Sequence, residues 1–403
     1  MPSKKKPFSG KAKKLQLQEK RERKIDGGKS NLLLPSKAGQ VAGSRMTCGD
    51  RAGPGRARRG GEAGQDRYRL QFRSESGAEL AAGREAAQQP LVVGRDRSIS
   101  TEQCFQPRHT FPTRPPWQPG CSKQHLERAE QRHFRQFVEK ALQEAEDGEE
   151  GASRTSFFEL NLETWRQLWR VTEMSDILLL ILDIRYAAAT FPPALYQHIV
   201  IEQKKALVLV LNKVDLIPAE LAAAWKIYFT ENFPGINIVF FTSYPSYNLI
   251  NVMRNGLRVK KLKANFEIAK EGALQILNIC QKISELNLED WRRLIHGEDG
   301  AGRLELEDGL GGEDQVLTLG TVGHPNVGKS SLINALLGRK RVSVSRTPGH
   351  TKHFQTIFLT RTVKLCDCPG LVFPSQVPRP LQVLMGSFPI SQVHTPGWTA
   401  NRY

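Results

Sequence analysis

The stretch Gly323-His324-Pro325-Asn326-Val327-Gly328-Lys329-Ser330 decides the fold. It follows the apolar run Gln315–Val322 and precedes an amphipathic segment, which is the strand, loop and helix context of a P-loop. Glycines in the loop allow backbone N–H groups to close around a phosphate, and the start of the helix adds a partial positive charge. The sequence therefore predicts a phosphate-binding loop at the end of a buried strand.

The polar residues of this loop have distinct expected roles toward a nucleoside triphosphate. Lys329 is expected to reach the β- and γ-phosphates, and the Ser330 hydroxyl is expected to bind Mg²⁺. The other nucleotide-binding candidates in and next to the loop are Gly323, Asn326, Val327, Gly328 and Ser331.

Two downstream elements are candidates for a nucleotide-dependent switch. Asp367-Cys368-Pro369-Gly370 begins 37 residues after Ser330 and follows an apolar run. Asp367 is expected to hold the Mg²⁺ shell, while the Gly370 N–H senses the γ-phosphate. In the intervening loop, Thr351 is the preferred residue to complete the Mg²⁺ sphere when the γ-phosphate is present, with Thr347 as the alternative.

A second recognition motif, Asn212-Lys213-Val214-Asp215, follows the apolar run Ala206–Leu211. The Asp215 carboxylate can accept hydrogen bonds from guanine N1–H and from the exocyclic amine, and adenine offers neither donor there. Asn212 is expected to bond the other edge of the base, and the Lys213 stem to cover the ring. The motif predicts GTP or GDP as the nucleotide and disfavours an ATPase. Candidates for a backbone N–H to the guanine oxygen are Thr242 and Ser243.

Six short apolar runs alternate with helical patterns between residues 161 and 390. Each is too short for a helix and typical of a strand buried in a parallel sheet. We predict one α/β domain with a doubly wound, mostly parallel six-stranded P-loop GTPase sheet. The six runs are Ile177–Leu182, Ala206–Leu211, Ile236–Phe241, Gln315–Val322, Gln355–Leu359 and Thr362–Cys366.

The rest of the chain divides by composition. Residues 1–37 form a basic arm; in residues 1–30, nine lysines and two arginines face three acidic residues. Residues 38–106, rich in Gly, Arg and Ala, are predicted to be disordered. Residues 107–160 comprise a proline-rich link and an amphipathic helix, and residues 391–403 form a tail. A stripe of Leu and Trp at helical spacing in residues 162–169 favours a core helix over a ligand platform.

The overall charge indicates the class of partner. With 58 Lys and Arg against 41 acidic residues, the net charge is +17 and the pI is about 9.7. This excess favours RNA or a ribonucleoprotein, bound through the basic arm, although such an arm can also be a solvated tail. The longest apolar run is too short to cross a bilayer, so no membrane partner is expected.

The order of the motifs is permuted. In most guanine-nucleotide switches the P-loop comes first, whereas here Asn212 precedes Gly323 by 111 residues. Joining the ends of a domain and opening another loop preserves every contact, so the sheet can be the same. This order resembles the YlqF/YawG family of circularly permuted GTPases. The resemblance rests on the motifs above, on Asp183-Ile184-Arg185 and on Asn161–Arg170.

The resemblance implies GTP hydrolysis as a conformational switch in assembly of the large ribosomal subunit. It also implies binding to pre-ribosomal particles or rRNA. The basic run in residues 1–30 indicates a nuclear or nucleolar location, with shuttling to the cytoplasm. Only 33 residues follow Gly370, and the helical C-terminal domain typical of the family is not among them. The alternative is therefore a catalytically impaired, truncated form that acts as a nucleotide-responsive RNA- or protein-binding module.

The hydrolysis step is expected to use no catalytic glutamine. Leu371 follows Gly370 at the position where many GTPases carry a water-positioning glutamine, and leucine cannot orient water. The resemblance implies that K⁺, held by Asn326, supplies positive charge at the phosphates in place of the glutamine. Catalytic roles are accordingly expected for Asn326, Lys329, Thr351 and Gly370. The alternative for Asn326 is a side chain that only stabilises the loop by bonding its own backbone.

Overall fold

The structure is a computed structural model of the 403-residue chain. The basic arm (1–37) and the tail (391–403) lie outside the described residues, so what was predicted for them stays a prediction. The residues described are 70–73, 77–88, 101–105, 110–146, 156–243, 256–296, 316–338, 341–345, 347–349, 351 and 353–388.

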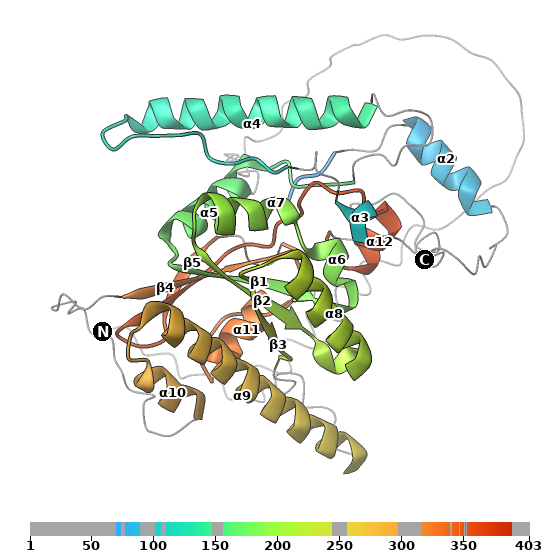
Figure 1. The fold of residues 1–403 in the computed structure, drawn as a ribbon. Helices are drawn as coiled ribbons and strands as arrows, with labels where there is room; N and C mark the ends of the chain where they lie inside the picture. Colours follow the sequence, from blue (N-terminus) through green and yellow to red (C-terminus); the bar gives the residue numbers. More distant parts are fainter. Residues whose placement is uncertain are drawn as a thin grey trace, which may run out of the picture. The chain divides into compact units, whose positions relative to one another are not determined.

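A six-stranded sheet in the order β3-β2-β1-β4-β6-β5 forms the centre of the fold (Figure 1). All neighbouring strands are parallel except β5 and β6. Each strand lies within two residues of a predicted apolar run, which confirms the mostly parallel six-stranded sheet. The strands are β1 Ile177–Asp183, β2 Ala206–Asn212, β3 Asn237–Phe240, β4 Leu317–Val322, β5 Gln355–Phe358 and β6 Val363–Asp367.

Helices connect these strands and cover both faces of the sheet (Figure 1). No helix within the described ranges is both long enough and apolar enough to span a membrane. The α-helices are α2 Gly77–Gln88, α3 Thr101–Cys104, α4 Lys123–Glu146, α5 Leu162–Met174, α6 Ala187–Thr190, α7 Pro193–Tyr196, α8 Ala219–Asn232, α9 Gly256–Ser284, α10 Glu289–His296, α11 Lys329–Leu336 and α12 Arg379–Leu384, and the other helical turns are η1 Ile184–Tyr186, η2 Gln197–Glu202 and η3 Val214–Leu216.

Strand β1 shows how the sequence divides the core into two layers. Its residues are all buried, and successive side chains point to opposite faces. Leu178, Leu180 and Leu182 belong to a cluster with α5 and α8, whereas Ile177 and its odd-numbered neighbours belong to a cluster with α9, α10 and α11. Because both faces are covered, the strand has no polar side, and its sequence is continuously apolar from Ile177 to Leu182.

Helix α5 packs its aromatic stripe into the core, as predicted. Trp165 and Leu168 are fully buried, and Trp169 is nearly so. Each indole N–H has a partner: Trp165 donates to the Glu159 carbonyl at 2.8 Å and Trp169 to the Pro112 carbonyl at 2.7 Å. Asn161 caps the helix by accepting the Glu163 N–H at 3.0 Å.

Three segments of the region expected to be disordered are structured: residues 70–73, residues 77–88, and residues 101–105, which include helix α3. Residues 77–88 form α2, and residues 70–73 pair with the segment before α5. Gln71 donates its backbone N–H to Glu159 Oε1 at 2.9 Å and accepts the Leu160 N–H at 2.8 Å. Leu70 is buried, so the expectation failed here because these few apolar residues bury themselves against the GTPase-like domain rather than against each other.

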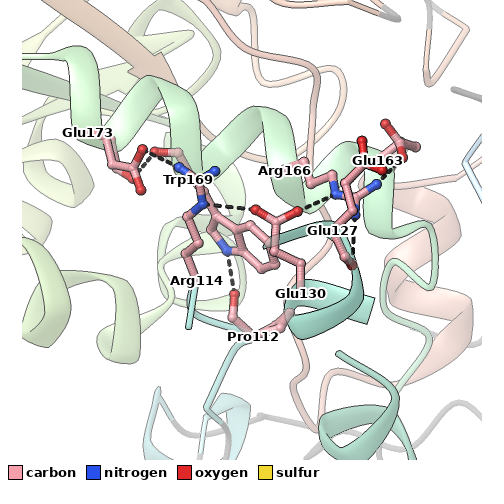
Figure 2. A network of polar contacts seen from close by, with 9 residues as sticks. Pro112, Arg114, Glu127, Glu130, Glu163, Arg166, Trp169 and Glu173 are labelled. Atoms are coloured by element: carbon pink, nitrogen blue, oxygen red, sulfur yellow. Dashed lines mark hydrogen bonds and ion pairs between the residues drawn. The ribbon is translucent and has the colours of Figure 1, made fainter. Parts of the chain in front are cut away.

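Helix α4 is attached to α5 by a buried ionic network (Figure 2). Glu130 lies between two arginines: Arg114 Nε donates to Oε1 at 2.9 Å and Arg166 Nε donates to Oε2 at 2.7 Å. Arg114 also pairs with Glu173 at 2.6 Å, and Arg166 with Glu163. Each arginine contacts two carboxylates, and the buried Glu130 carboxylate contacts both arginines, which offsets the cost of removing Glu130 from water.

Removal of the central carboxylate is expected to destabilise the protein strongly. Glu130→Ala leaves Arg114 and Arg166 without their shared partner, and breaking a buried ion pair typically costs about 3–5 kcal/mol. The free energy of unfolding, measured by chemical denaturation, should fall by that order. The exposed Glu139 on the same helix offers the matched control, since Glu139→Ala should change it by less than about 0.5 kcal/mol. Equal losses in both variants would contradict a structural role for the network.

Candidate nucleotide-binding site

The predicted P-loop connects the end of β4 to the start of α11. Gly328 precedes the helix with a φ of +106°, in the left-handed region that favours glycine. A Cβ at this position would lie 2.1 Å from the Asn212 amide nitrogen, so a side chain there would collide with the guanine-recognition motif. The glycine is therefore needed both for the turn and for the contact between the two motifs.

Lys329 is buried at the start of α11 and points back into the loop. Its ammonium donates to the carbonyls of Gly323 at 2.9 Å and His324 at 2.6 Å. Burial lowers the pKa of Lys329 to about 8, while the charge of Asp367 acts in the opposite direction. This places a cationic group on the inside of the loop, where a bound phosphate would meet it.

The three predicted Mg²⁺ ligands come together. Ser330 Oγ lies 3.4 Å from both Thr351 Oγ1 and Asp367 Oδ2. These are oxygen atoms of the kind that Mg²⁺ prefers, and one of them is a carboxylate. Asp367 is fully buried at the end of β6. The alternative Thr347 is exposed, and its backbone N–H donates to Ser345 Oγ at 3.0 Å. The donor set therefore fits a hard divalent cation at Ser330, Thr351 and Asp367.

The guanine-recognition motif is bound directly to the P-loop. Asn212 is fully buried at the end of β2, and its amide donates to the Val327 carbonyl at 2.7 Å. Its amide oxygen accepts the Lys213 N–H at 2.8 Å. The Lys213 ammonium donates to the Asn326 carbonyl at 2.9 Å. Asn212 and Lys213, predicted to contact the base, thus also fix the base-recognition motif against the phosphate loop.

Asp215 is oriented by its neighbour at the end of β3. The Thr242 hydroxyl donates to Asp215 Oδ1 at 2.7 Å, and the Val214 N–H donates to the Phe241 carbonyl at 3.2 Å. Ser243 Oγ lies 3.7 Å from the position that a Cβ would take on Gly328. The structure therefore brings Thr242 and Ser243 beside the motif, and it gives Thr242 a side-chain contact that was not predicted.

Asp183 is a site residue whose role the sequence did not reveal. It is buried at the end of β1, and Oδ2 accepts from the Lys213 ammonium at 2.6 Å and from the Arg185 guanidinium at 2.7 Å. Burial acts to raise the pKa of Asp183, but hydrogen bonds and charge from Arg185 and Lys213 prevail and lower it. The position of Asp183 at a strand end, two residues before an arginine, was the available signal.

Comparison with known proteins places this site in a family. Residues 318–387 match the family model described as 50S ribosome-binding GTPase. Guanine nucleotide-binding protein-like 1 from Rattus norvegicus is 42% identical over 97% of this chain and 72% of its own length. The human protein of that name is 41% identical over 99% of this chain and 74% of its own.

Two further proteins are similar over shorter regions. Large subunit GTPase 1 from Saccharomyces cerevisiae is 38% identical over 66% of this chain and 40% of its own length. The solved structure of GNP-bound YlqF from T. maritima is 19% identical, with a TM-score of 0.31, and covers 57% of this chain and 69% of that chain. The chain belongs to the circularly permuted GTPases. Hydrolysis of GTP is the activity of this family.

In this circularly permuted GTPase, the segment after Gly370 is hydrogen-bonded at two places. The first anchor is the P-loop, and the second is the segment before α5. On one side, Leu371 donates its N–H to the Gly323 carbonyl at 3.2 Å, and the Asn326 amide donates to the Gly386 carbonyl at 3.0 Å. A Cβ on Gly370 would lie 2.6 Å from Pro325 Cα, so only glycine allows this approach to the P-loop.

The second anchor is the extended segment that precedes α5. Glu159 donates its N–H to the Val372 carbonyl at 3.0 Å, and Ser156 donates its N–H to the Ser375 carbonyl at 2.9 Å. The Ser156 hydroxyl also donates to the Val377 carbonyl at 2.5 Å. The segment after the switch is thus paired with residues far before it in the chain.

Glu159 in this second anchor is expected to make stability depend on pH. Its side chain is fully buried; Oε1 accepts backbone N–H groups, and Oε2 has no partner within the part of the chain that the structure describes. Burial raises the pKa of Glu159 to about 8 from an ordinary 4.5, against the opposing effect of these hydrogen bonds. The folded state then binds more protons than the unfolded state between these values, so stability is lost as the pH rises from 4.5 to 8.

The variant Glu159→Gln keeps the shape of the side chain but cannot titrate. Its free energy of unfolding should therefore not show the decrease between pH 4.5 and pH 8 that is caused by Glu159. The difference between pH 5 and pH 8 should be smaller than in the parent by several kcal/mol, on the order of 3–5. Denaturant titrations at both pH values measure it, with the exposed Glu139→Gln as the control that should follow the parent. A parallel fall in Glu159→Gln and the parent would show that Glu159 is already ionised in the folded protein.

Proposed function

We propose that this chain binds GTP and GDP with Mg²⁺ at the site described and hydrolyses GTP as a switch during assembly of the large ribosomal subunit. The single observation that best supports this is the direct contact of the two recognition motifs. The Asn212 amide bonds to Val327, and the Lys213 ammonium bonds to Asn326. A base held by one motif and a phosphate held by the other would therefore belong to the same nucleotide.

The phosphate end of the proposed site uses backbone and side-chain donors together. Gly323, Gly328 and the start of α11 would donate backbone N–H groups to a bound phosphate, and Lys329 would supply the positive charge. Mg²⁺, held by Ser330, Thr351 and Asp367, would neutralise the charge that develops on the phosphate oxygens. The Gly370 N–H would sense the γ-phosphate, and Ser331 would add a further N–H from the first turn of α11.

At the position where many GTPases carry a water-positioning glutamine, this chain has Leu371. Leu371 is fully buried, so it cannot orient a nucleophile in the site. We propose K⁺ at Asn326 as the substitute charge near the bridging phosphate oxygen. The buried leucine equally favours the second candidate function, a nucleotide-responsive RNA- or protein-binding module without turnover. Single-turnover hydrolysis of labelled GTP separates the two.

The proposed partners are pre-ribosomal particles or rRNA, and the proposed location is the nucleus and nucleolus with shuttling to the cytoplasm. Support comes from the names of similar proteins, such as Large subunit GTPase 1, and from the net charge of +17. The basic arm is proposed as the part that contacts phosphate groups.

Guanine selectivity should depend on Asp215. In Asp215→Asn the carboxylate no longer accepts two N–H groups, so GTP should bind more weakly by about 2–4 kcal/mol. Xanthosine nucleotides should bind more tightly to the variant than to the parent, because their extra carbonyl pairs with the new amide. Titration calorimetry with GTP, XTP and ATP measures these affinities, and Glu220→Gln on the exposed first turn of α8 is the control. Equal binding of ATP and GTP to the parent would contradict the assignment.

Hydrolysis should be slow and stimulated by potassium. GTP turnover is compared in potassium and in sodium chloride at equal ionic strength, for the parent and for Asn326→Ala. We expect faster turnover in potassium for the parent and no preference in the variant, because the amide oxygen that would bind the cation is gone. Asn326→Ala also removes the hydrogen bond to Gly386, which would lower turnover in both salts. Loss of a bound cation would instead lower turnover only in potassium. Equal rates in both salts for both proteins would leave only a structural role for Asn326.

Residues 1–30 should direct the protein to nucleoli and bind RNA through phosphate contacts. Deleting them removes eleven cationic side chains, so nucleolar concentration should be lost, and RNA affinity should depend less steeply on salt. Fluorescence microscopy of tagged protein, together with RNA binding at several salt concentrations, measures both effects. A shortened protein that still concentrates in nucleoli would exclude the arm as the targeting element.

A further inference from the structure

Helix α4 has a buried acidic residue on one face and exposed arginines on the opposite face. Its inner face carries the buried Glu130 and Phe134, and Glu130 is the centre of the network with Arg114 and Arg166 (Figure 2). The helix therefore uses an acidic side chain to attach itself to the protein. It is held at a fixed orientation, because both oxygens of Glu130 are bonded to groups outside α4.

The outer face of α4 carries an arginine stripe, composed of Arg128, Arg132 and Arg135. Spacings of four and three residues place these side chains on one face, opposite Glu130 and Phe134, over about 10 Å of helix. All three are exposed, and among the described residues none of them forms an ion pair. The next acidic residue on this face is Glu139, one turn beyond Arg135.

We propose that the arginine stripe of α4 binds the phosphate backbone of RNA, as a second RNA contact in addition to the basic arm. The choice of partner class rests on the proposed function in ribosome assembly, whereas the surface itself follows from the geometry of α4. Guanidinium groups pair with phosphate oxygens through two parallel hydrogen bonds. A row of them on a rigid helix fits a polymer that presents a charge at every residue.

The same face does not fit a membrane surface. A helix that lies on a membrane exposes its apolar side chains to the lipid, with basic residues beside them. In α4 the large apolar residues are instead buried or half-buried against the protein. They are Leu126, Phe134, Phe137, Val138 and Leu142.

The test uses the full chain and a labelled RNA duplex of about 20 base pairs, titrated by fluorescence anisotropy over a range of salt concentrations. The triple variant Arg128→Gln, Arg132→Gln, Arg135→Gln keeps helix-forming side chains of similar length. Its affinity should fall by about tenfold or more at about 0.1 M salt, and the slope of log affinity against log salt should decrease by about three. The corresponding triple lysine variant keeps the charges and should retain most of the affinity.

The matched control removes three exposed cations elsewhere: Lys226→Gln in α8, Lys282→Gln in α9 and Arg361→Gln after β5. It carries the same change in net charge and should stay within about twofold of the parent. An equal loss in the control and the stripe variant would overturn the proposal, because the effect would then be general electrostatics. Preferential binding of the parent to phosphatidylserine vesicles over RNA, lost in the stripe variant, would also overturn it in favour of a membrane surface.

Binding of fluorescent GTP to the same proteins keeps the two proposals separate. The stripe variant should bind GTP as the parent does, because α4 contributes no residue to the nucleotide site. If the parent bound no guanine nucleotide, the proposed function would fail whatever the RNA result. If GTP bound normally and RNA affinity did not respond to the stripe variant, only the RNA surface would fail.

Discussion

The hydrogen bond from the Asn212 amide to the Val327 carbonyl is the constraint on which the site depends. It joins the end of β2 to the loop after β4, across 115 residues of sequence. The pairing of β1 with β4 makes this contact possible, because it brings together the two halves of the sheet. Backbone bonds between β1 and β4 and side-chain bonds between the loops hold these halves in register.

The contact between the guanine-recognition motif and the P-loop also depends on the ion pair of Lys213 with Asp183. Lys213 reaches from the guanine-recognition motif to the P-loop, and its ammonium is neutralised by Asp183. A lysine held among carbonyl oxygens alone would carry an uncompensated charge in a partly buried place. Arg185 pairs with the same carboxylate, so Asp183 holds two cations on the base side of the site. The Asp-x-Arg element therefore has a physical role in positioning Lys213.

The sequence was most informative where one local rule determines the structure. The central strands β1, β2 and β4 were predictable because strands buried on both faces are almost continuously apolar, and the P-loop because its glycines precede a helix start. The contacts of Asp183, Glu130 and residues 70–73 were not predictable. Each depends on which distant segment lies beside it, and no periodicity records that. Similarly, no local rule predicted that the amide nitrogen of Asn326 donates to the Gly386 carbonyl, 60 residues further on.

Helix α5 connects the switch segments to the surface proposed for RNA. Its Gln167 accepts the Phe354 N–H beside β5, and the residues just before the helix pair with the segment after Gly370. The helix and the residues just before it therefore contact the chain on both sides of Asp367, one of the residues proposed to hold Mg²⁺. From the same helix, Arg166 bonds to Glu130 of α4. A change in the position of α5 between nucleotide states would act on α4 through the buried ion pair of Arg166 with Glu130. RNA contact at α4 and the nucleotide state would then be coupled through one rigid element, and linkage requires that coupling to act in both directions.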